Sequence, residues 1–361
     1  MKFLISGAAG FIGCNLARHL VKTAGHQVIG IDKLTYAGNL NSLDDLVDSS
    51  DFTFIKADIC DSDTISSLLE QHQPDGVLHL AAESHVDRSI DGPDEFIQTN
   101  IVGTYRMLQC SRAYFDSLAG SKRDAFRFLH VSTDEVYGSL ELESPAFTET
   151  NRYDPHSPYS ASKASSDHLV RAWNDTFGLP TLITNCSNNY GPYQFPEKLI
   201  PVVVLKALRG DSIPVYGTGE NIRDWLYVDD HAKAIEAVFL RGRVGQTYNV
   251  GGDNEMTNID LVRLICTHLD EFAPIDANPA LSKKGNEITS YADLITFVTD
   301  RPGHDLRYAI DSTKIRDQVG WQPVENKETG LAKTVRWYLN NDQWCQQIFS
   351  GDYQLSRRGL S

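Results

Sequence analysis

The sequence predicts an α/β fold, in which a doubly wound parallel sheet is joined to a smaller mixed α/β domain. Two observations lead to this expectation. Short apolar runs alternate with helical patterns through residues 1–250, as strands and their covering helices do in such sheets. A glycine-rich run, GAAGFIG, follows the first apolar run directly, and polar residues gather where later runs end. Ligands bind at that edge of a parallel sheet, so we expect the chemistry of this chain there.

Composition limits the classes of function. The 361 residues suffice for one large or two ordinary domains, and 41% hydrophobic with 22% charged residues is typical of a soluble globular protein. The net charge of −15 argues against nucleic-acid or anionic-membrane binding. The six cysteines are scattered without metal-ligand spacing, so we expect no metal site and a reducing cytoplasm. We recognise no signal peptide or membrane anchor.

The first predicted unit is a strand at residues 2–6, the glycine run, and a helix at residues 15–21. Gly7, Gly10 and Gly13 would let the backbone approach a pyrophosphate, while the helix N-terminus supplies N–H donors. An ordinary turn also uses glycines, so this signal is weak alone.

The second predicted strand, residues 27–31, ends in Asp32. A carboxylate about 20 residues beyond the glycines accepts hydrogen bonds from ribose hydroxyls and repels a 2′-phosphate. Asp32 therefore favours NAD over NADP, and the neighbouring Lys33 is the one feature that speaks against this selection.

The third and fourth predicted strands are residues 52–56 and 76–80. Asp58 and Ile59, after the third strand, are a plausible contact for the adenine end of a dinucleotide. Small residues after the fourth strand would let the cofactor lie close, and His85 beyond them either touches substrate or is a surface histidine without a role.

The fifth predicted strand, residues 126–131, runs into Ser132, Thr133, Asp134 and Glu135. Hydroxyls and paired acids at this edge are candidates for chemistry. Alternatively, such residues cap the turn that follows a strand.

Tyr159 and Lys163 lie four residues apart and would share one face of a helix. A free tyrosine ionises near pH 10, but a neighbouring ammonium and a positively charged nicotinamide stabilise the phenolate. A solvated helix face gives the same pattern. The glycine run, Asp32 and Thr133 earlier in the chain favour a catalytic pair.

The motifs GAAGFIG, LAAESHVDRS, STDEVYG, YSASK and NCSNNYGPYQFPEKLIP resemble the extended short-chain dehydrogenase/reductase superfamily and, within it, the dTDP-glucose 4,6-dehydratase family. The resemblance extends over essentially the whole chain, including DRPGHDLRYAID and the terminal TVRWY helix. It implies NAD-dependent oxidation at carbon 4, elimination of water across carbons 5 and 6, and hydride return to carbon 6. The implied product is dTDP-4-keto-6-deoxyglucose.

The resemblance also implies residue roles. Thr133, Tyr159 and Lys163 would serve hydride transfer, Glu135 would be the base of the elimination and Asp134 its acid. The implied NAD contacts are Gly7, Gly10, Phe11, Ile12, Gly13, Asp32, Lys33, Leu34, Thr35, Asp58, Ile59, Leu80, Ala81, Ala82, Ser84, Thr99, Ser132, Tyr159, Lys163, Asn185, Ser187 and Asn189. The implied substrate contacts are Ser84, His85, Thr133, Asn188, Lys198, Leu199, Pro214, Tyr216, Arg223, Asn258, Asp300, Arg301 and His304. The cations among them suit a diphosphate.

After a strand at residues 181–185 the composition becomes irregular and proline-rich. We expect residues 1–186 and 221–250 to form the NAD-binding Rossmann domain, and residues 187–220 and 251–361 the nucleotide-sugar-binding domain. By analogy with the superfamily, helices at about 95–118 and 158–177 would pair two chains into a homodimer through a four-helix bundle.

Three alternatives stay open. A nucleotide-sugar 4-epimerase or decarboxylase, or a dehydratase of UDP- or CDP-sugars, would use the same fold, tyrosine and NAD. An epimerase needs no acid pair, so Asp134 and Glu135 speak against it. A non-catalytic NAD-binding regulatory module would not require Tyr159 and Lys163.

Overall fold

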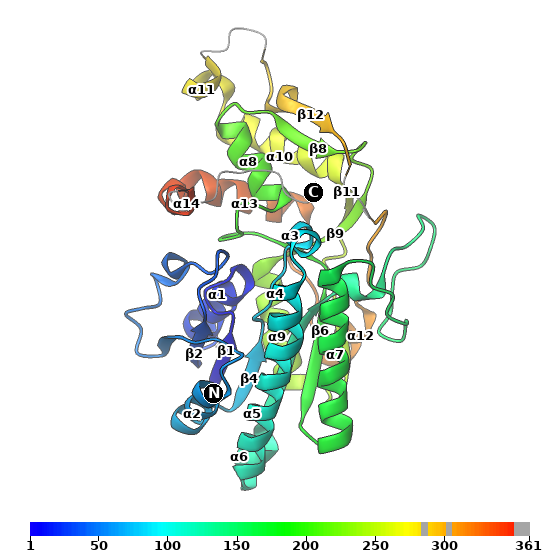
Figure 1. Ribbon diagram of the computed structural model, residues 1–361. Helices are drawn as coiled ribbons and strands as arrows, with labels where there is room; N and C mark the ends of the chain where they lie inside the picture. The colour runs from blue at the N-terminus through cyan, green and yellow to red at the C-terminus, as the bar shows by residue number, and fades with distance from the viewer. Residues whose placement is uncertain (283–287, 301–304, 350–361) are drawn as a thin grey trace.

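The computed structural model describes residues 1–282, 288–300 and 305–349. Its larger part is a seven-stranded parallel sheet with helices on both faces (Figure 1), which confirms the predicted fold class. In order across the sheet, the strands are β10 (Thr247–Val250), β6 (Thr181–Cys186), β5 (Arg127–Thr133), β4 (Gly76–His79), β1 (Lys2–Ser6), β2 (Gln27–Asp32) and β3 (Phe52–Lys56). The strand order reverses between β1 and β4, and such a switch point opens a crevice at the carboxyl ends of the strands.

The central strands are apolar because both faces of the sheet are covered. Phe3 and Ile5 of β1 pack into the core on one face, whereas Leu4 packs into the core on the other. All three side chains are fully buried. This alternation of neighbouring residues between two cores fixes the position of the strand.

Helices form a layer on each face of the sheet. One face is covered by α1 (Phe11–Arg18), α9 (Val228–Arg241) and α12 (Thr313–Val319). The other is covered by α2 (Ser62–His72), α5 (Thr104–Ser117) and α7 (Pro158–Phe177). Ser157 begins α7 with a capping box, in which its hydroxyl accepts a hydrogen bond from the Ser160 N–H at 3.0 Å.

Two helices differ from the sequence prediction. The helix expected at residues 15–21 begins at Phe11, directly after the glycines, and continues into the π-helix η1 (His19–Thr23). The helix expected at about residues 95–118 is divided into α4 (Asp94–Phe96), the π-helix η3 (Ile97–Gly103) and α5. Hydrophobic periodicity predicts helix in both places but does not distinguish π-helical turns from α-helical ones.

The smaller part lies over the carboxyl ends of the strands (Figure 1) and has its own apolar core. Its helices include α8 (Leu199–Leu208), α10 (Asn258–Phe272), α13 (Lys327–Asn340) and α14 (Asp342–Phe349). Its strands form two small sheets, β11 (Glu255–Thr257) with β9 (Ile222–Tyr227) and β7 (Asn188–Tyr190), and β12 (Ile295–Val298) with β8 (Ile213–Tyr216). The remaining short elements are η2 (Leu40–Leu43), α3 (Val86–Asp91), α6 (Gly120–Ala125), η4 (Asp134–Tyr137), η5 (Ile275–Ala277), α11 (Pro279–Ser282) and η6 (Tyr291–Leu294).

The chain returns to the large sheet near its end, within the range that the sequence analysis gave to the second domain. Ile315 and Val319 of α12, with Trp321 just beyond it, join the core beneath α9. The Trp321 indole N–H donates to the Asp230 carbonyl of α9 at 3.1 Å. These apolar side chains cover α9 and β10, which would otherwise be exposed on that face.

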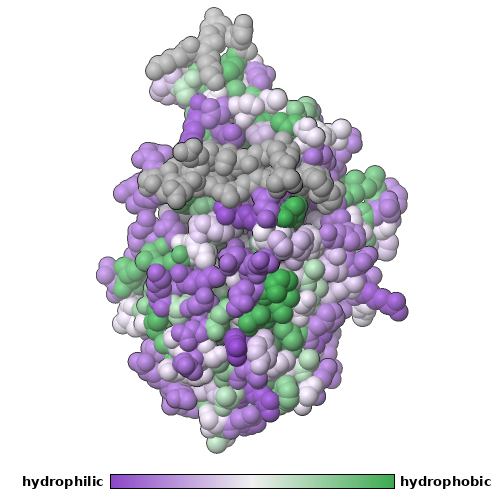
Figure 2. Space-filling model, viewed as in Figure 1, coloured by the Kyte–Doolittle hydropathy of each residue, from purple (hydrophilic) through white to green (hydrophobic). Residues whose placement is uncertain are grey.

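The surface drawn in Figure 2 is mixed, with many hydrophilic residues and smaller hydrophobic groups. Ile97 lies in η3, which packs beside α7, and its side chain is 48% exposed.

Within the described ranges, no helix has the length and apolar character needed to span a membrane.

Candidate active site

A cleft of about 350 Å³ lies at the switch point, between the strand ends and the smaller part. It is lined by residues that follow β1, β2, β4, β5 and β6, and by the 194–200 segment from the other side. Over the described parts of the chain, no three or more His, Cys, Asp or Glu side chains are grouped so that they could hold a metal ion.

The glycine turn leaves room that any side chain would fill. Gly7 has φ +75°, and a Cβ there would lie 2.8 Å from the Ala81 amide nitrogen. A Cβ on Gly13 would lie 1.9 Å from the Gly7 carbonyl oxygen. Gly10 is the N-cap of α1 and provides no side-chain cap, which leaves the first N–H groups of the helix to an anion. This cradle fits the pyrophosphate of a dinucleotide.

Asp32 stands at the end of β2, on the wall of the cleft. Its carboxylate accepts hydrogen bonds from the Leu34 N–H at 2.8 Å and the Ala9 N–H at 3.1 Å, and burial raises its pKa. Lys33 donates to the Thr99 hydroxyl at 3.2 Å. The carboxylate thus has a fixed position on the cleft wall, and its contact with the ribose of NAD stays a prediction.

The five predicted catalytic residues, Thr133, Asp134, Glu135, Tyr159 and Lys163, all line the cleft. The Tyr159 phenol is buried, and this burial, followed by the charge of Glu135, raises its pKa well above the usual value. A hydrogen bond with Thr133 acts in the opposite direction. A proton acceptor at this position therefore needs nearby positive charge.

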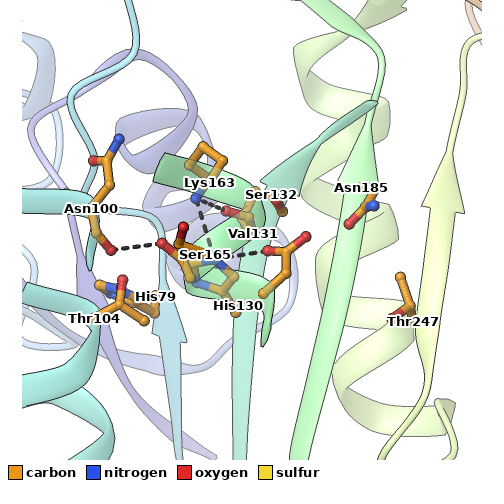
Figure 3. A network of polar contacts seen from close by, with 12 residues as sticks. His79, Asn100, Thr104, His130, Val131, Ser132, Lys163, Ser165, Asn185 and Thr247 are labelled. Atoms are coloured by element: carbon orange, nitrogen blue, oxygen red, sulfur yellow. Dashed lines mark hydrogen bonds and ion pairs between the residues drawn. The ribbon is translucent and has the colours of Figure 1, made fainter. Parts of the chain in front are cut away.

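Lys163 lines the same cleft, four residues after Tyr159 on α7. Its ammonium donates to the Val131 carbonyl at 2.9 Å and lies 3.3 Å from His130 Nε2 (Figure 3). Burial lowers the pKa of Lys163 to about 8, so the side chain is still mostly protonated at neutral pH.

Asp134 is suited to be an acid. Burial, then the charges of Glu135 and Asp224, raise the pKa of its carboxyl group well above the ordinary value. The Thr133 hydroxyl donates to Asp134 Oδ1 at 3.3 Å, and Oδ2 has no hydrogen-bond partner among the described residues. A carboxyl group that keeps its proton to higher pH than usual thus lies next to a second carboxyl residue, Glu135, at the end of β5.

The cleft also collects most of the other predicted contacts. The predicted residues on its lining, besides the catalytic ones, are Gly7, Gly10, Phe11, Ile12, Gly13, Asp32, Lys33, Thr35, Ile59, Leu80, Ala81, Ala82, Ser84, Thr99, Ser132, Ser187, Asn188, Asn189, Lys198 and Leu199. The described predicted residues away from the lining are Leu34, Asp58, His85, Asn185, Pro214, Tyr216, Arg223, Asn258 and Asp300. Arg301 and His304 lie outside the described residues.

Two of the residues away from the lining are held by protein groups. Asn185 is fully buried, and its amide donates to the Tyr153 hydroxyl at 3.0 Å. Arg223 donates to the Asp305 carbonyl at 2.9 Å and lies over the Tyr308 ring. Contact of either residue with a ligand stays a prediction.

The sequence analysis missed several residues of the cleft wall. Those with polar or aromatic side chains are Glu83, Gln194, Phe195, Glu197 and Trp225. Glu197 pairs with Arg88 at 3.1 Å, and Lys198 donates to the Ser84 carbonyl at 3.1 Å, so this segment is tied to the far side of the cleft. The irregular, proline-rich sequence of this segment predicted a loop, but it did not indicate which residues the loop contacts.

A parallel sheet with a glycine cradle, a carboxylate for ribose and a Tyr–Lys pair in one cleft defines a class, the NAD-dependent enzymes of the short-chain dehydrogenase/reductase superfamily. The sequence model of a family described as GDP-mannose 4,6 dehydratase matches residues 4–334. The dTDP-glucose 4,6-dehydratase of Salmonella typhimurium is 57% identical, with 98% of this chain and 97% of that protein covered. That of Neisseria meningitidis is 55% identical, with 99% of each covered. The chain therefore belongs to the dTDP-glucose 4,6-dehydratase family, as its sequence motifs suggested.

Solved structures agree. A dTDP-glucose 4,6-dehydratase from Streptomyces venezuelae with NAD bound has a TM-score of 0.84 and 40% identity, covering 96% of this chain and 100% of that one. The UDP-glucose 4-epimerase of Thermotoga maritima has a TM-score of 0.79 and 26% identity, covering 94% and 99%. The fold is thus shared with epimerases.

Proposed function

We propose that this protein is an NAD-dependent hydro-lyase that converts dTDP-glucose into dTDP-4-keto-6-deoxyglucose. The observation that carries the proposal is the acid pair at the end of β5. Asp134, with its raised pKa, and Glu135 lie in the same cleft as Tyr159 and Lys163. An oxidation site and an elimination site therefore face one substrate.

The oxidation depends on Thr133, Tyr159 and Lys163. The Thr133 hydroxyl holds the 4-hydroxyl of the sugar, and Tyr159 accepts the proton from that hydroxyl as the 4-ketone forms. The ammonium of Lys163 stabilises the phenolate that this step needs. Bound NAD supplies the hydride acceptor for carbon 4 and the hydride donor for carbon 6.

The elimination depends on Asp134 and Glu135. The 4-ketone acidifies the hydrogen on carbon 5, and Glu135 removes it as a proton. The electron pair of that bond forms the carbon 5–carbon 6 double bond as the carbon 6–oxygen bond breaks. Asp134 gives its proton to the leaving hydroxyl, which departs as water. The two groups must begin in opposite protonation states, and the burial of Asp134 beside Glu135 favours that arrangement.

An epimerase is the main rival, because its fold, tyrosine and cofactor are the same. It would return hydride to carbon 4 and leave carbon 5 untouched. The experiment is therefore to supply dTDP-glucose deuterated at carbon 4, in ordinary and in heavy water. We expect deuterium from carbon 4 at carbon 6 of the product, and solvent deuterium at carbon 5, by mass spectrometry and proton NMR. Label retained at carbon 4 would identify an epimerase instead.

Parallel incubations with UDP-, CDP- and GDP-sugars test the nucleotide. We expect the 4-keto-6-deoxy product only from the thymidine substrate. Faster turnover of another nucleotide sugar would assign a different substrate to the enzyme without changing the type of reaction.

The proposal includes three further expectations. Residues 1–186 with 221–250 would act as the NAD-binding domain, and the remainder as the domain for the nucleotide sugar. The enzyme would work in the cytoplasm as a homodimer that pairs η3, α5 and α7 of two chains. The partly exposed Ile97 of η3 supports that choice of face.

A further inference from the structure

Helix α7 carries four charged residues at intervals of four, and the first three of them are Lys163, Asp167 and Arg171. Residues at this spacing share one face of a helix. Lys163 is 4% exposed and Asp167 is fully buried, so this face of α7 points into the protein. Buried charges of this kind need partners, and only Lys163 of the three lines the cleft.

His130 of β5 connects the first two of these residues. Its Nε2 lies 3.3 Å from the ammonium of Lys163 and 3.4 Å from Asp167 Oδ1. Figure 3 shows Lys163 directed toward the ring of His130 and the carbonyl of Val131. The catalytic lysine and the carboxylate thus approach the same nitrogen of one imidazole.

Asp167 is fixed from its other side as well. The Tyr153 hydroxyl donates to Asp167 Oδ2 at 2.8 Å. Arg171 and Asn185 donate in turn to the Tyr153 oxygen, at 2.6 and 3.0 Å. Oδ2 is therefore held by the Tyr153 hydroxyl, while Oδ1 lies 3.4 Å from His130 Nε2.

The charge states follow from burial and proximity. Burial, then the charge of Lys163, lowers the pKa of His130 to about 4, so the imidazole is neutral at neutral pH. Burial alone would raise the pKa of Asp167, but its hydrogen bond with His130 and the nearby positive charges outweigh it and lower the pKa. Asp167 is therefore an ionised carboxylate inside the protein.

Lys163 depends on that carboxylate. Burial lowers its pKa, and the groups that raise it are Asp167 and then Cys186. The Cys186 thiol has a pKa raised by burial to about 12 and is neutral, so Asp167 is the ionised group that favours the ammonium. The titratable and charged groups packed around this site are His79 of β4, His130 of β5, Cys186 of β6, Tyr137 of η4, Tyr153, and Tyr159, Asp167 and Arg171 of α7.

We infer that Asp167 and His130 are positioning residues of this enzyme, which hold the Lys163 side chain in place and maintain its charge beside Tyr159. The inference rests on the proposed function, since the charge matters only if Tyr159 exchanges a proton with substrate. Neither residue lines the cleft. The other explanation is a buried ion pair that contributes to folding alone.

The test is Asp167→Asn, which removes the charge and keeps the shape. Activity at high pH is lost as Lys163 loses its proton, so the basic limb of the kcat profile should move to lower pH by about one unit. KM for dTDP-glucose should stay unchanged, because Asp167 does not reach the cleft. Asp167→Glu restores the charge and should move the limb back toward its original position.

Asp230→Asn is the matched control. Asp230 is a buried carboxylate of α9 that accepts hydrogen bonds from the N–H groups of Val324 and Glu325, away from the cleft. Its replacement should lower stability and leave the pH profile in place. A lower kcat for Asp167→Asn with an unmoved limb would assign the pair to folding alone and overturn the inference.

A binding measurement separates this inference from the proposed function. The dissociation constant of NAD, measured by calorimetry across the same pH range, should rise when Lys163 loses its proton, because NAD is an anion. In Asp167→Asn that rise should begin about one unit lower. NAD binding can be measured in this way even if the protein does not turn over dTDP-glucose. Absence of turnover would count against the proposed function only. Should Asp167→Asn not fold, His130→Phe keeps the ring volume, removes the ring nitrogen beside the Lys163 ammonium and should move the limb in the same direction. Loss of folding in both variants would assign the pair to folding.

Discussion

At the scale of single residues, burial sets the chemistry of the cleft. It raises the pKa of Tyr159 and Asp134 and lowers that of Lys163 to about 8. Desolvation disfavours the charged form of every group, so buried acids keep their protons to higher pH and buried bases lose theirs at lower pH. The result is a carboxyl group that keeps its proton to higher pH than usual and a cation close to its titration range in one site, which suits proton transfer.

The division of labour between Tyr159 and Glu135 can be tested with two variants. Tyr159→Phe removes the group that accepts the proton of the 4-hydroxyl, so no NADH absorbance should appear when substrate is added. Glu135→Gln leaves that step intact and removes the base for carbon 5, so NADH should accumulate with the 4-ketose. Equal loss of NADH formation in both variants would contradict two separate stages.

Asp32 should determine cofactor affinity and selectivity. Asp32→Ala removes a charge-assisted hydrogen bond to the ribose, which should weaken NAD binding by about 1.5–3 kcal/mol in calorimetry. The purified protein should carry NAD. Asp51→Ala, at an exposed acid before β3, is the control and should bind NAD as the unchanged protein does. NADP in the purified protein would rule out the role given to Asp32.

At the scale of elements, the turn between β1 and α1 depends on its glycines. Gly13→Ala would place a Cβ 1.9 Å from the Gly7 carbonyl oxygen, so the turn must open. We expect NAD binding to be lost and the free energy of unfolding to fall by about 1–3 kcal/mol, measured by denaturant titration. Gly92→Ala meets no atom within 4 Å and should change neither quantity. Normal NAD affinity in Gly13→Ala would show that the cradle does not hold the pyrophosphate.

At the scale of the whole molecule, contacts between distant segments close the cleft and tie the chain end to it. Arg88 and Glu197, 109 positions apart, pair across the cleft at 3.1 Å. Trp344 of α14 donates to the Ser42 hydroxyl in η2, near the loop that follows β2. Both parts of the chain are therefore held together around the site, although most of each part packs on its own core.

Global stability should depend on buried histidines as pH falls. Burial lowers the pKa of His231 to about 3, and its Nδ1–H donates to Asn189 Oδ1 at 2.8 Å. The unfolded chain binds a proton at this residue below pH ~6.5 and the folded protein does not, so stability is lost with falling pH. The stability difference between the unchanged protein and His231→Gln should therefore decrease by about 1.4 kcal/mol per unit from about pH 6 to about pH 4, in denaturant titrations. A difference independent of pH would mean that His231 is charged in the fold.

The sequence by itself determined the strand ends and the residues on them. Asp32 closes β2 where it was expected, and the strand expected to end at residue 131 continues to Thr133, with the two acids directly after it. These features are local: hydrophobic runs define strands, and their carboxyl ends meet at one edge of a parallel sheet. The four-residue spacing of Tyr159 and Lys163 likewise places both on one helix face without knowledge of the rest of the fold.

Only the tertiary structure decided which distant residues meet and how burial changes them. Glu197 reaches the cleft from an irregular segment, and Lys163 and Asp167 both approach Nε2 of His130, a residue of another element. The return of α12 to the large sheet had no local signal either. Contacts of this kind depend on how elements pack, and a pKa depends on the desolvation that packing imposes, so periodicity and spacing carry no information about them.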